Sequence, residues 1–258
     1  MRQAWDLSYL YLQSYLRRHV YAGTLLVSLI LLGLPSYVSA FSMGLDSFER
    51  VAKDFGITLI GAYALVIVLL LGLTTAARDL QTRALYPILA RPVSRGVYLW
   101  GHLLALAQFL GASLVVLSGT LMLGLGLKTG RVDLSILWAS YGVFLPTILI
   151  AAVCLVASLR CSPALAGTIG MAVNLLGNLS GAFIRFFLVE DRGSAVSATL
   201  AKVLKGALPN LTLFSLKDPM VHHIALPPGY LVSISYYAAV WVVITMLLGQ
   251  LIFRKVDL

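Results

Sequence analysis

The chain is poor in charged residues, in cysteine and, within its long apolar runs, in acids. Of its 258 residues 11% are charged and 60% are hydrophobic, a balance that excludes a soluble globular domain of this length. Two cysteines, Cys154 and Cys161, are too few for a disulfide framework and are interpreted as packing residues. The sequence holds no G-x-x-x-x-G-K-[ST] phosphate loop. The composition therefore indicates an integral membrane protein without an ATP site of its own.

Long runs without any charge make up most of the chain. They cover residues 20–41, 55–77, 96–127, 134–159, 161–184 and 230–253, and each reaches the roughly 20 residues that a helix needs to cross a bilayer. We therefore predict an all-α membrane protein with six transmembrane helices in one polytopic domain, residues 1–258. The expected spans are about 20–41, 55–77, 97–124, 134–159, 163–187 and 230–253. Residues 42–54, with five charged side chains, are expected to form a solvated turn.

The distribution of Lys and Arg predicts the orientation. Both termini are placed in the cytoplasm, because ten cationic residues of the short segments then lie inside and the short outer loops hold only Arg50, Lys53, Lys128 and Arg131. The other five lie in the long fifth connection, which carries little weight in this rule. The protein is then a multi-pass protein of the cell inner (cytoplasmic) membrane. The net charge of +9 is spread over span ends and not gathered on one soluble face, so lipid head groups, and not nucleic acid, are the expected partners.

Two amphipathic segments flank the spans. Residues 1–19 place Trp5 and Tyr9 on one helical stripe and polar residues on another, which predicts an interfacial helix before the first span. Residues 196–207 repeat apolar side chains at helical spacing, which predicts a short outer amphipathic segment before the sixth span. His222 and His223 invite a metal interpretation, but adjacent helical positions point apart, so no metal site is expected.

The fifth apolar run carries a stripe of small and polar residues at helical spacing: Asn174, Gly177, Asn178 and Gly181. Such a face permits close helix contact with amides that hydrogen-bond across it. Polar residues within a membrane span also mark solute pathways and subunit interfaces. Two interpretations of the stripe are equally supported: it packs against other helices of this chain, or it lines a solute pathway or a dimer interface.

The segment from Arg78 to Arg95 is the one strongly basic stretch between two apolar runs. Four arginines cannot be buried in lipid, since each costs about 2.5–3.5 kcal/mol at mid-bilayer, so the segment lies at the membrane edge. Leu80, Ala84, Leu85, Ile88 and Leu89 recur at helical spacing and predict a short amphipathic helix.

This segment resembles the region between the second and third spans of exporter-type (type 2) ABC transporter permeases, in particular those similar to the permease of the nitrous-oxide reductase maturation operon. The shared residues are Arg78, Asp79, Leu85, Ile88, Leu89, Arg91, Pro92, Val93, Ser94, Arg95 and Gly101. The chain departs from the family pattern at Gln81, Arg83, Ala84, Pro87 and His102. A second match covers Leu208-Pro209-Asn210-Leu211, Phe214, Leu216-Lys217-Asp218 and Pro227-Pro228-Gly229-Tyr230.

The resemblance implies a transport subunit and not an enzyme. Residues 78–95 would be the cytoplasmic coupling helix, with Asp79, Leu85, Ile88 and Leu89 docking on a separate ABC ATPase and Arg78, Arg91 and Arg95 fixing its position. Pro92 and Ser94 would belong to the same docking segment. Two permease chains, identical or different, would assemble with two ATPase copies, and ATP and Mg²⁺ would be bound only by the ATPase.

Two other function classes fit less well. An ion-coupled secondary carrier usually keeps an ionisable residue at mid-membrane, whereas all ten Asp and Glu residues lie outside the six runs. A membrane-embedded lipid-modifying enzyme would need a nucleophile or metal set, and the four histidines lie in distant segments.

Overall fold

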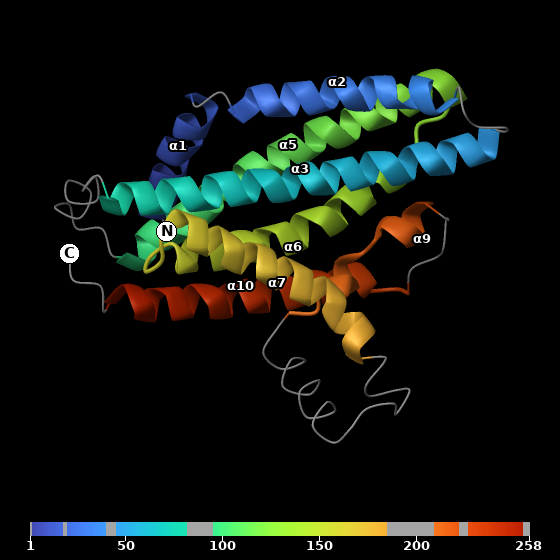
Figure 1. Cartoon of the computed structure of the whole chain (residues 1–258). Coiled ribbons are helices and arrows are strands. Elements are labelled where there is room, and N and C mark those ends of the chain that lie inside the picture. The colour runs from blue at the N-terminus through green and yellow to red at the C-terminus, as the bar shows by residue number, and fades with distance from the viewer. Residues whose placement is uncertain are drawn as a thin grey trace.

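The chain forms a bundle of long helices, seen in a computed structural model (Figure 1). The structure describes residues 2–17, 20–39, 45–81, 95–184, 209–221 and 227–254, and within these ranges it contains helices and connecting turns but no strand. The all-α class predicted from the sequence is confirmed for this part of the chain.

The helices follow the apolar runs closely. They are α1 (Arg2–Arg17), α2 (Val20–Ser39), α3 (Leu45–Gln81), α5 (Arg95–Thr129), α6 (Ser135–Ala157), α7 (Pro163–Ile184), the 3₁₀ helix η2 (Leu211–Phe214), α9 (Lys217–Val221) and α10 (Tyr230–Arg254). Long apolar runs that are rich in Leu and Ala and hold no charged residue favour helices of this length. Pro35 and Pro146 lie inside α2 and α6 without ending either helix.

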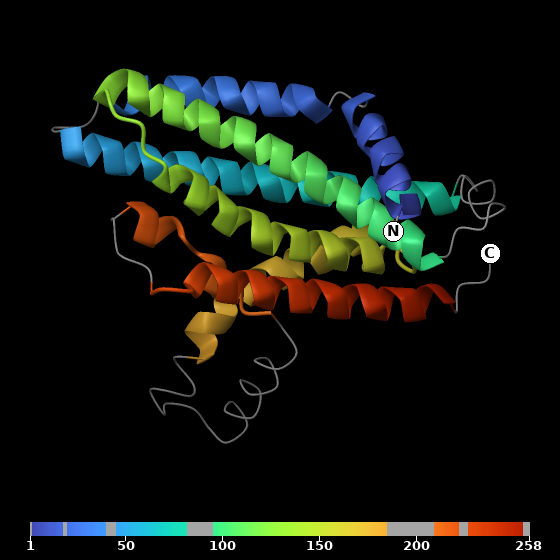
Figure 2. The same ribbon diagram turned by 180° about the vertical axis from the view of Figure 1, so that it is seen from behind.

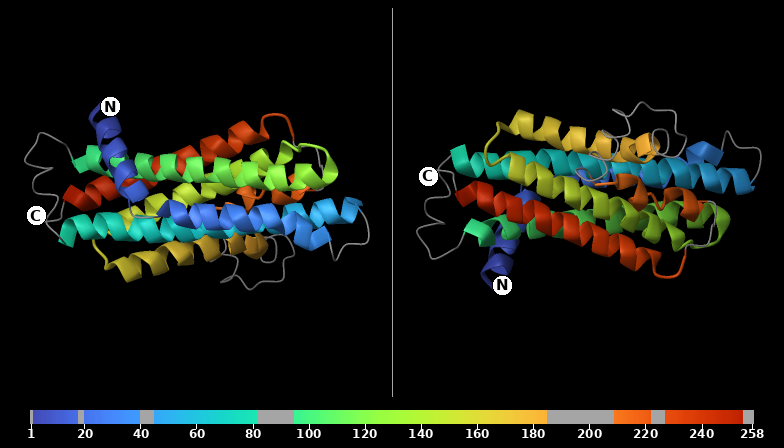
Figure 3. Two further views of the ribbon diagram at one scale, coloured as in Figure 1. Left: turned by 90° about the horizontal axis from the view of Figure 1, so that it is seen from above. Right: turned by 90° about the horizontal axis from the view of Figure 1, so that it is seen from below.

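Helices α5 and α6 form the centre of the bundle. Helix α5 packs against α1, α2, α3, α6 and α10, and α6 packs against α3, α5, α7, η2, α9 and α10. Seen from above and from below, α7 and α10 lie on opposite sides of α6 (Figure 3). The outer helices leave many large apolar side chains exposed, among them Leu29 of α2 and Leu175 of α7. In a bilayer these side chains face lipid.

Among the residues that the structure describes, four helical stretches are long and apolar enough to cross a membrane: Phe48–Gly72, Gly96–Thr129, Ser135–Ala157 and Tyr230–Phe253. Two shorter apolar stretches, Tyr21–Pro35 and Pro163–Leu179, lie within α2 and α7. Several apolar helices of this kind make the chain a multi-pass membrane protein.

Residues 45–54 are helical, so the predicted solvated turn over 42–54 is wrong from Leu45 onward. Helix α3 begins at Leu45, and Lys53, expected in solvent, is only 2% exposed. Glu49 and Lys53 form a salt bridge four residues apart, the spacing that stabilises a helix. The charged residues of this segment therefore extend the helix and do not end it.

The bundle has two ends that the connections define. At the Asp133 end, α5 stops at Thr129 and Gly130 adopts a left-handed conformation (φ 68°) that favours glycine, with its N–H bonded to the Gly126 carbonyl. At the Gln81 end, α3 finishes at Gln81 and α5 begins at Arg95. Helix α3 thus runs the full length of the bundle between the two ends (Figure 1).

Helix α1 occupies Arg2–Arg17, within the segment predicted as an N-terminal helix, and lies across the first turns of α5 (Figure 2). Aromatic contacts fix it there: Tyr15 packs on Phe109 with ring centroids 6.1 Å apart, and Tyr11 packs on His102 at 3.8 Å. Trp5 and Tyr9 stay exposed on the other side. Its place at a membrane surface stays a prediction.

Candidate functional site

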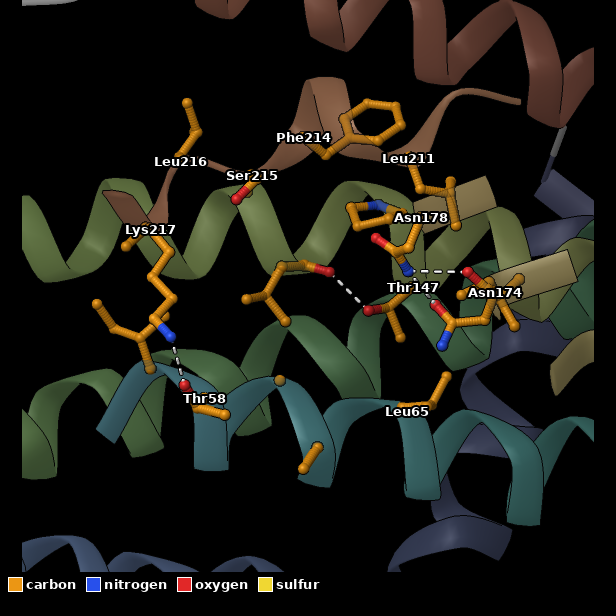
Figure 4. A pocket seen from close by; sticks show the side chains of 18 residues that line it. Thr58, Leu65, Thr147, Asn174, Asn178, Leu211, Phe214, Ser215, Leu216 and Lys217 are labelled. Carbon is orange, nitrogen blue, oxygen red and sulfur yellow. Dashed lines mark hydrogen bonds between the residues drawn. The ribbon is translucent and has the colours of Figure 1, made fainter. Parts of the chain in front are cut away.

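A cleft opens between α3, α6 and α7 and is closed at one side by the stretch that contains η2. Its volume is about 450 Å³, within the range typical of small-molecule sites. The walls are apolar, with a few polar groups between them (Figure 4). The lining includes Thr58 and Leu65 of α3, Pro146 and Thr147 of α6, and Asn174 and Asn178 of α7.

Asn174 and Asn178 form the polar wall of this cleft. The Nδ2 of Asn178 donates to the Asn174 backbone carbonyl at 2.8 Å and to its Oδ1 at 3.1 Å. The four-residue spacing brings the two side chains together on one face of α7. Among the described residues, no hydrogen-bond partner occupies Asn174 Nδ2 or Asn178 Oδ1. The pair therefore presents one amide donor group and one amide acceptor beside the cleft.

Helix α6 contributes polar groups opposite this pair. Pro146 has no N–H, so the carbonyl of Gly142 lacks its usual helical donor. The Thr147 hydroxyl donates to the Val143 carbonyl at 2.6 Å and keeps lone pairs available as an acceptor. Figure 4 shows the Thr147 hydroxyl beside the two asparagines, at the opposite end of the cleft from Lys217.

Lys217 is the one ionisable side chain among the described residues that line the cleft. It donates to the Thr58 hydroxyl at 2.7 Å and forms a 2.8 Å salt bridge with Asp54. Its positive charge is thus matched by a carboxylate before any ligand arrives. The described residues therefore give the cleft little net charge.

Residues 209–217, which we name the wedge segment, fill the space between α6, α7 and α10. Within it, Leu211, Phe214 and Leu216 are at most 3% exposed. Asn210 accepts a 3.2 Å hydrogen bond from the Thr212 N–H and begins η2, and its own N–H donates to the Tyr237 hydroxyl of α10 at 3.0 Å. The Tyr230 hydroxyl donates to the Leu213 carbonyl at 2.7 Å. Non-helical backbone is thus kept satisfied beside the long helices.

Two glycines make room for the wedge segment. A Cβ at Gly177 of α7 would lie 2.6 Å from Leu211 Cγ, and one at Gly142 of α6 would lie 2.7 Å from the Phe214 carbonyl oxygen. Gly170, one helical repeat before Gly177, meets Cys154 of α6 in the same way. Gly177 of the predicted stripe therefore contacts this chain's own Leu211, while Asn174 and Asn178 of the same stripe line the cleft.

The remaining predicted site residues fall at or outside the limits of the described chain. Arg78 and Asp79 belong to the last turn of α3, and Arg95 is the first residue of α5. Gly181 lies in the last turn of α7. The other predicted docking residues, which lie outside the described residues, are Leu85, Ile88, Leu89, Arg91, Pro92 and Ser94.

A buried ion pair near the Asp133 end escaped sequence reasoning. Lys53 contacts both Glu49 of its own helix and Asp133 of the α5–α6 connection. Burial disfavours the charged form of Asp133, but hydrogen bonds from Lys53 and from Ser135 outweigh it and hold the pKa of this carboxyl below its ordinary value. The only available signal was the four-residue spacing of Glu49 and Lys53.

The polar groups that the described residues bring to the cleft are amides, hydroxyls and one lysine that is paired with Asp54. Within the described ranges, no three His, Cys, Asp or Glu side chains gather in a group that could hold a metal ion. These polar groups are placed between apolar walls, the arrangement that is typical of small-molecule binding sites.

The comparisons with known proteins add no family. No protein-family model matches the chain, and a search of the curated proteins finds no match.

Proposed function

We propose that the chain is the permease subunit of an ATP-driven exporter of the ABC type. In this proposal it has six transmembrane spans, α2, α3, α5, α6, α7 and α10, in the cell inner membrane, with both termini in the cytoplasm. A second permease chain, identical or different, completes the path, and two copies of a cytoplasmic ATPase bind and hydrolyse ATP with Mg²⁺.

The continuity of α3 supports this proposal most directly. It is a single helix of 37 residues, about 55 Å long, and it includes Thr58 and Leu65 of the cleft as well as Arg78 and Asp79 of the basic segment. A helix of this kind transmits a push at one end to the other with little loss. Movement of the basic segment would therefore tilt the wall of the cleft.

The Gln81 end fits the place of an ATPase contact. Residues 82–94 join the end of α3 to the beginning of α5, the helix that packs against five others at the centre of the bundle. A partner that moves this connection acts on both helices at once. The resemblance of residues 78–95 to the coupling segment of type 2 permeases points to the same role.

The ionisable groups of the structure agree less well with an ion-coupled carrier. Lys53, the one charged side chain that is fully buried among the described residues, lies near the Asp133 end and is already paired with Glu49 and Asp133. A carrier needs a group near mid-membrane that exchanges its ion during each cycle.

Affinity purification from native membranes tests the proposal. The chain carrying a tag is solubilised in mild detergent, and the intact assembly is analysed by mass spectrometry. We expect an ATPase to be recovered in equal number with the permease chains, and ATP to stimulate flux in vesicles. Flux that follows an ion gradient and ignores ATP, with no ATPase in the assembly, would contradict it.

A further inference from the structure

The cleft has the shape of an elongated site. Along α3 its lining runs from Ile57 to Leu65, about 12 Å, and along α6 it runs from Ala139 to Ile150, about 16 Å. The two asparagines lie at one end and Lys217 at the other (Figure 4). A ligand that fills this space is a chain-like molecule with a polar group at one end.

The charge distribution selects against ions. Among the described lining residues only Lys217 is ionisable, and its salt bridge with Asp54 neutralises it. An anion or cation placed between these apolar walls would lose its hydration without gaining an opposite charge. The described lining therefore favours an uncharged ligand.

The amide atoms of Asn174 and Asn178 that lack a partner indicate which polar group the ligand carries. Asn178 donates both of its recorded bonds to Asn174, which fixes the orientation of the pair and leaves Asn174 Nδ2 as a donor and Asn178 Oδ1 as an acceptor. Figure 4 shows the Asn174 amide nitrogen directed toward the side of the cleft on which Leu65 lies. An amide or a hydroxyl group on the ligand could accept a hydrogen bond from Asn174 Nδ2 and donate one to Asn178 Oδ1. An alkane would leave both atoms without partners.

We infer that this cleft binds an uncharged amphiphile with an apolar chain along α3 and α6 and an amide or hydroxyl group at Asn174 and Asn178. The inference rests on the proposed function, because it identifies the class of solute that the permease would export.

Photocrosslinking of the purified full-length chain in nanodiscs tests it. The probe is decanamide carrying a diazirine on its chain, and the competitors are unlabelled decanamide, decane and decanoate. We expect labelling on the cleft residues of α3, α6 or α7, with decanamide competing best. Replacing both amides, N174L with N178L, should weaken decanamide competition about tenfold, the effect of losing one or two hydrogen bonds.

Two further variants separate binding from folding. Thr168→Val removes a polar side chain from an exposed position of α7 that does not line the cleft, and labelling should be unchanged. Asn178→Ser keeps a donor and an acceptor at an exposed position and should bind decanamide more tightly than Asn178→Leu. Both measurements are made on protein that elutes as a single species.

Three results would overturn the inference. They are decane competing as well as decanamide, decanoate competing better, and labelling that persists unchanged in the doubly substituted variant. These results concern the ligand alone, because the recovery of an ATPase with the chain is measured separately. Selective amide binding without any associated ATPase would instead support the ligand site and count against the proposed exporter.

Discussion

Lys53 of α3 forms a salt bridge with Asp133 of the α5–α6 connection, although the lysine side chain is only 2% exposed. Glu49 of α3 completes a group in which one buried cation is shared by two partly exposed carboxylates. The group ties the beginning of α3 to the turn between the two central helices. It therefore sets the position of α3 at the end opposite the basic segment.

Substitution of Lys53 by Met should destabilise the protein. The change leaves two carboxylates without their shared cation, and a lost charged hydrogen bond in a partly buried place costs about 1–3 kcal/mol. We expect a lower melting temperature of the detergent-solubilised chain. The matched control is Lys217→Met, whose salt bridge to Asp54 is 30% and 49% exposed and should contribute less than about 1 kcal/mol. Equal melting of the two variants would refute the role given to Lys53.

Acid should weaken the same contact. The pKa of Asp133 lies below its ordinary value of 3.8 because the hydrogen bonds from Lys53 and Ser135 outweigh the effect of burial. A carboxyl with a lowered folded-state pKa stabilises the fold above its unfolded pKa, and this contribution is lost as the pH falls through the folded value. The difference in melting temperature between wild type and Asp133→Asn should stay constant between about pH 8 and about pH 5, then shrink below about pH 4. A difference that changes near neutral pH would point to another group.

Gly142→Ala should disturb the wedge segment. The new Cβ would lie 2.7 Å from the Phe214 carbonyl oxygen and 2.9 Å from Leu216 Cβ, so α6 and the wedge segment must separate, at a cost of about 1–3 kcal/mol. Melting temperature measures this loss. Gly119→Ala in α5 is the control, because no heavy atom lies within 4 Å of the Cβ position. If Gly142→Ala and the control have the same melting temperature, the wedge segment can move away from α6 without a measurable loss of stability.

The fold class and most helix limits could be predicted because they depend on local composition. Helix α6 (Ser135–Ala157) lies within the predicted span 134–159, and α10 (Tyr230–Arg254) begins where the sixth run begins. Uninterrupted apolar residues give the same result whatever their neighbours in space. The helical start of α3 at Leu45 could not be found in this way, because a tertiary ion pair at Lys53 makes a charged segment part of the bundle.

The sequence predicted the polar residues of the candidate site but not the segment that packs beside them. Asn174 and Asn178 stood out because amides are rare in an apolar run, and they do line the cleft. Gly177 belonged to the same stripe, but its neighbour is Leu211, a residue of the wedge segment and not of another long helix. The spacing of small residues predicts that another part of the protein packs closely against the helix, but it does not identify that part.

Two acidic substitutions in the basic segment should separate the permease from its ATPase. Leu85→Asp with Ile88→Asp places charge on the predicted apolar docking face, and we expect the ATPase to be lost from the affinity-purified assembly while membrane insertion is unchanged. Gln81→Asp adds a carboxylate on the other side of the predicted helix and should retain the ATPase. Recovery of the ATPase at wild-type yield with the doubly substituted chain would show that the docking assignment is wrong.

Asn178→Leu should impair export while leaving the assembly intact. The Asn178 side chain is exposed at the cleft and its recorded hydrogen bonds go only to Asn174, so its loss removes an acceptor from the cleft without opening a cavity in the core. Gly181→Leu, near the end of α7, tests whether the rest of the stripe shares this role. Transport is measured as ATP-dependent flux in vesicles that contain equal amounts of complex, with Thr168→Val as the matched substitution on an exposed face of the same helix. Unchanged flux with Asn178→Leu would assign the stripe to packing, because a pathway residue cannot lose its only free acceptor without affecting the solute that passes it.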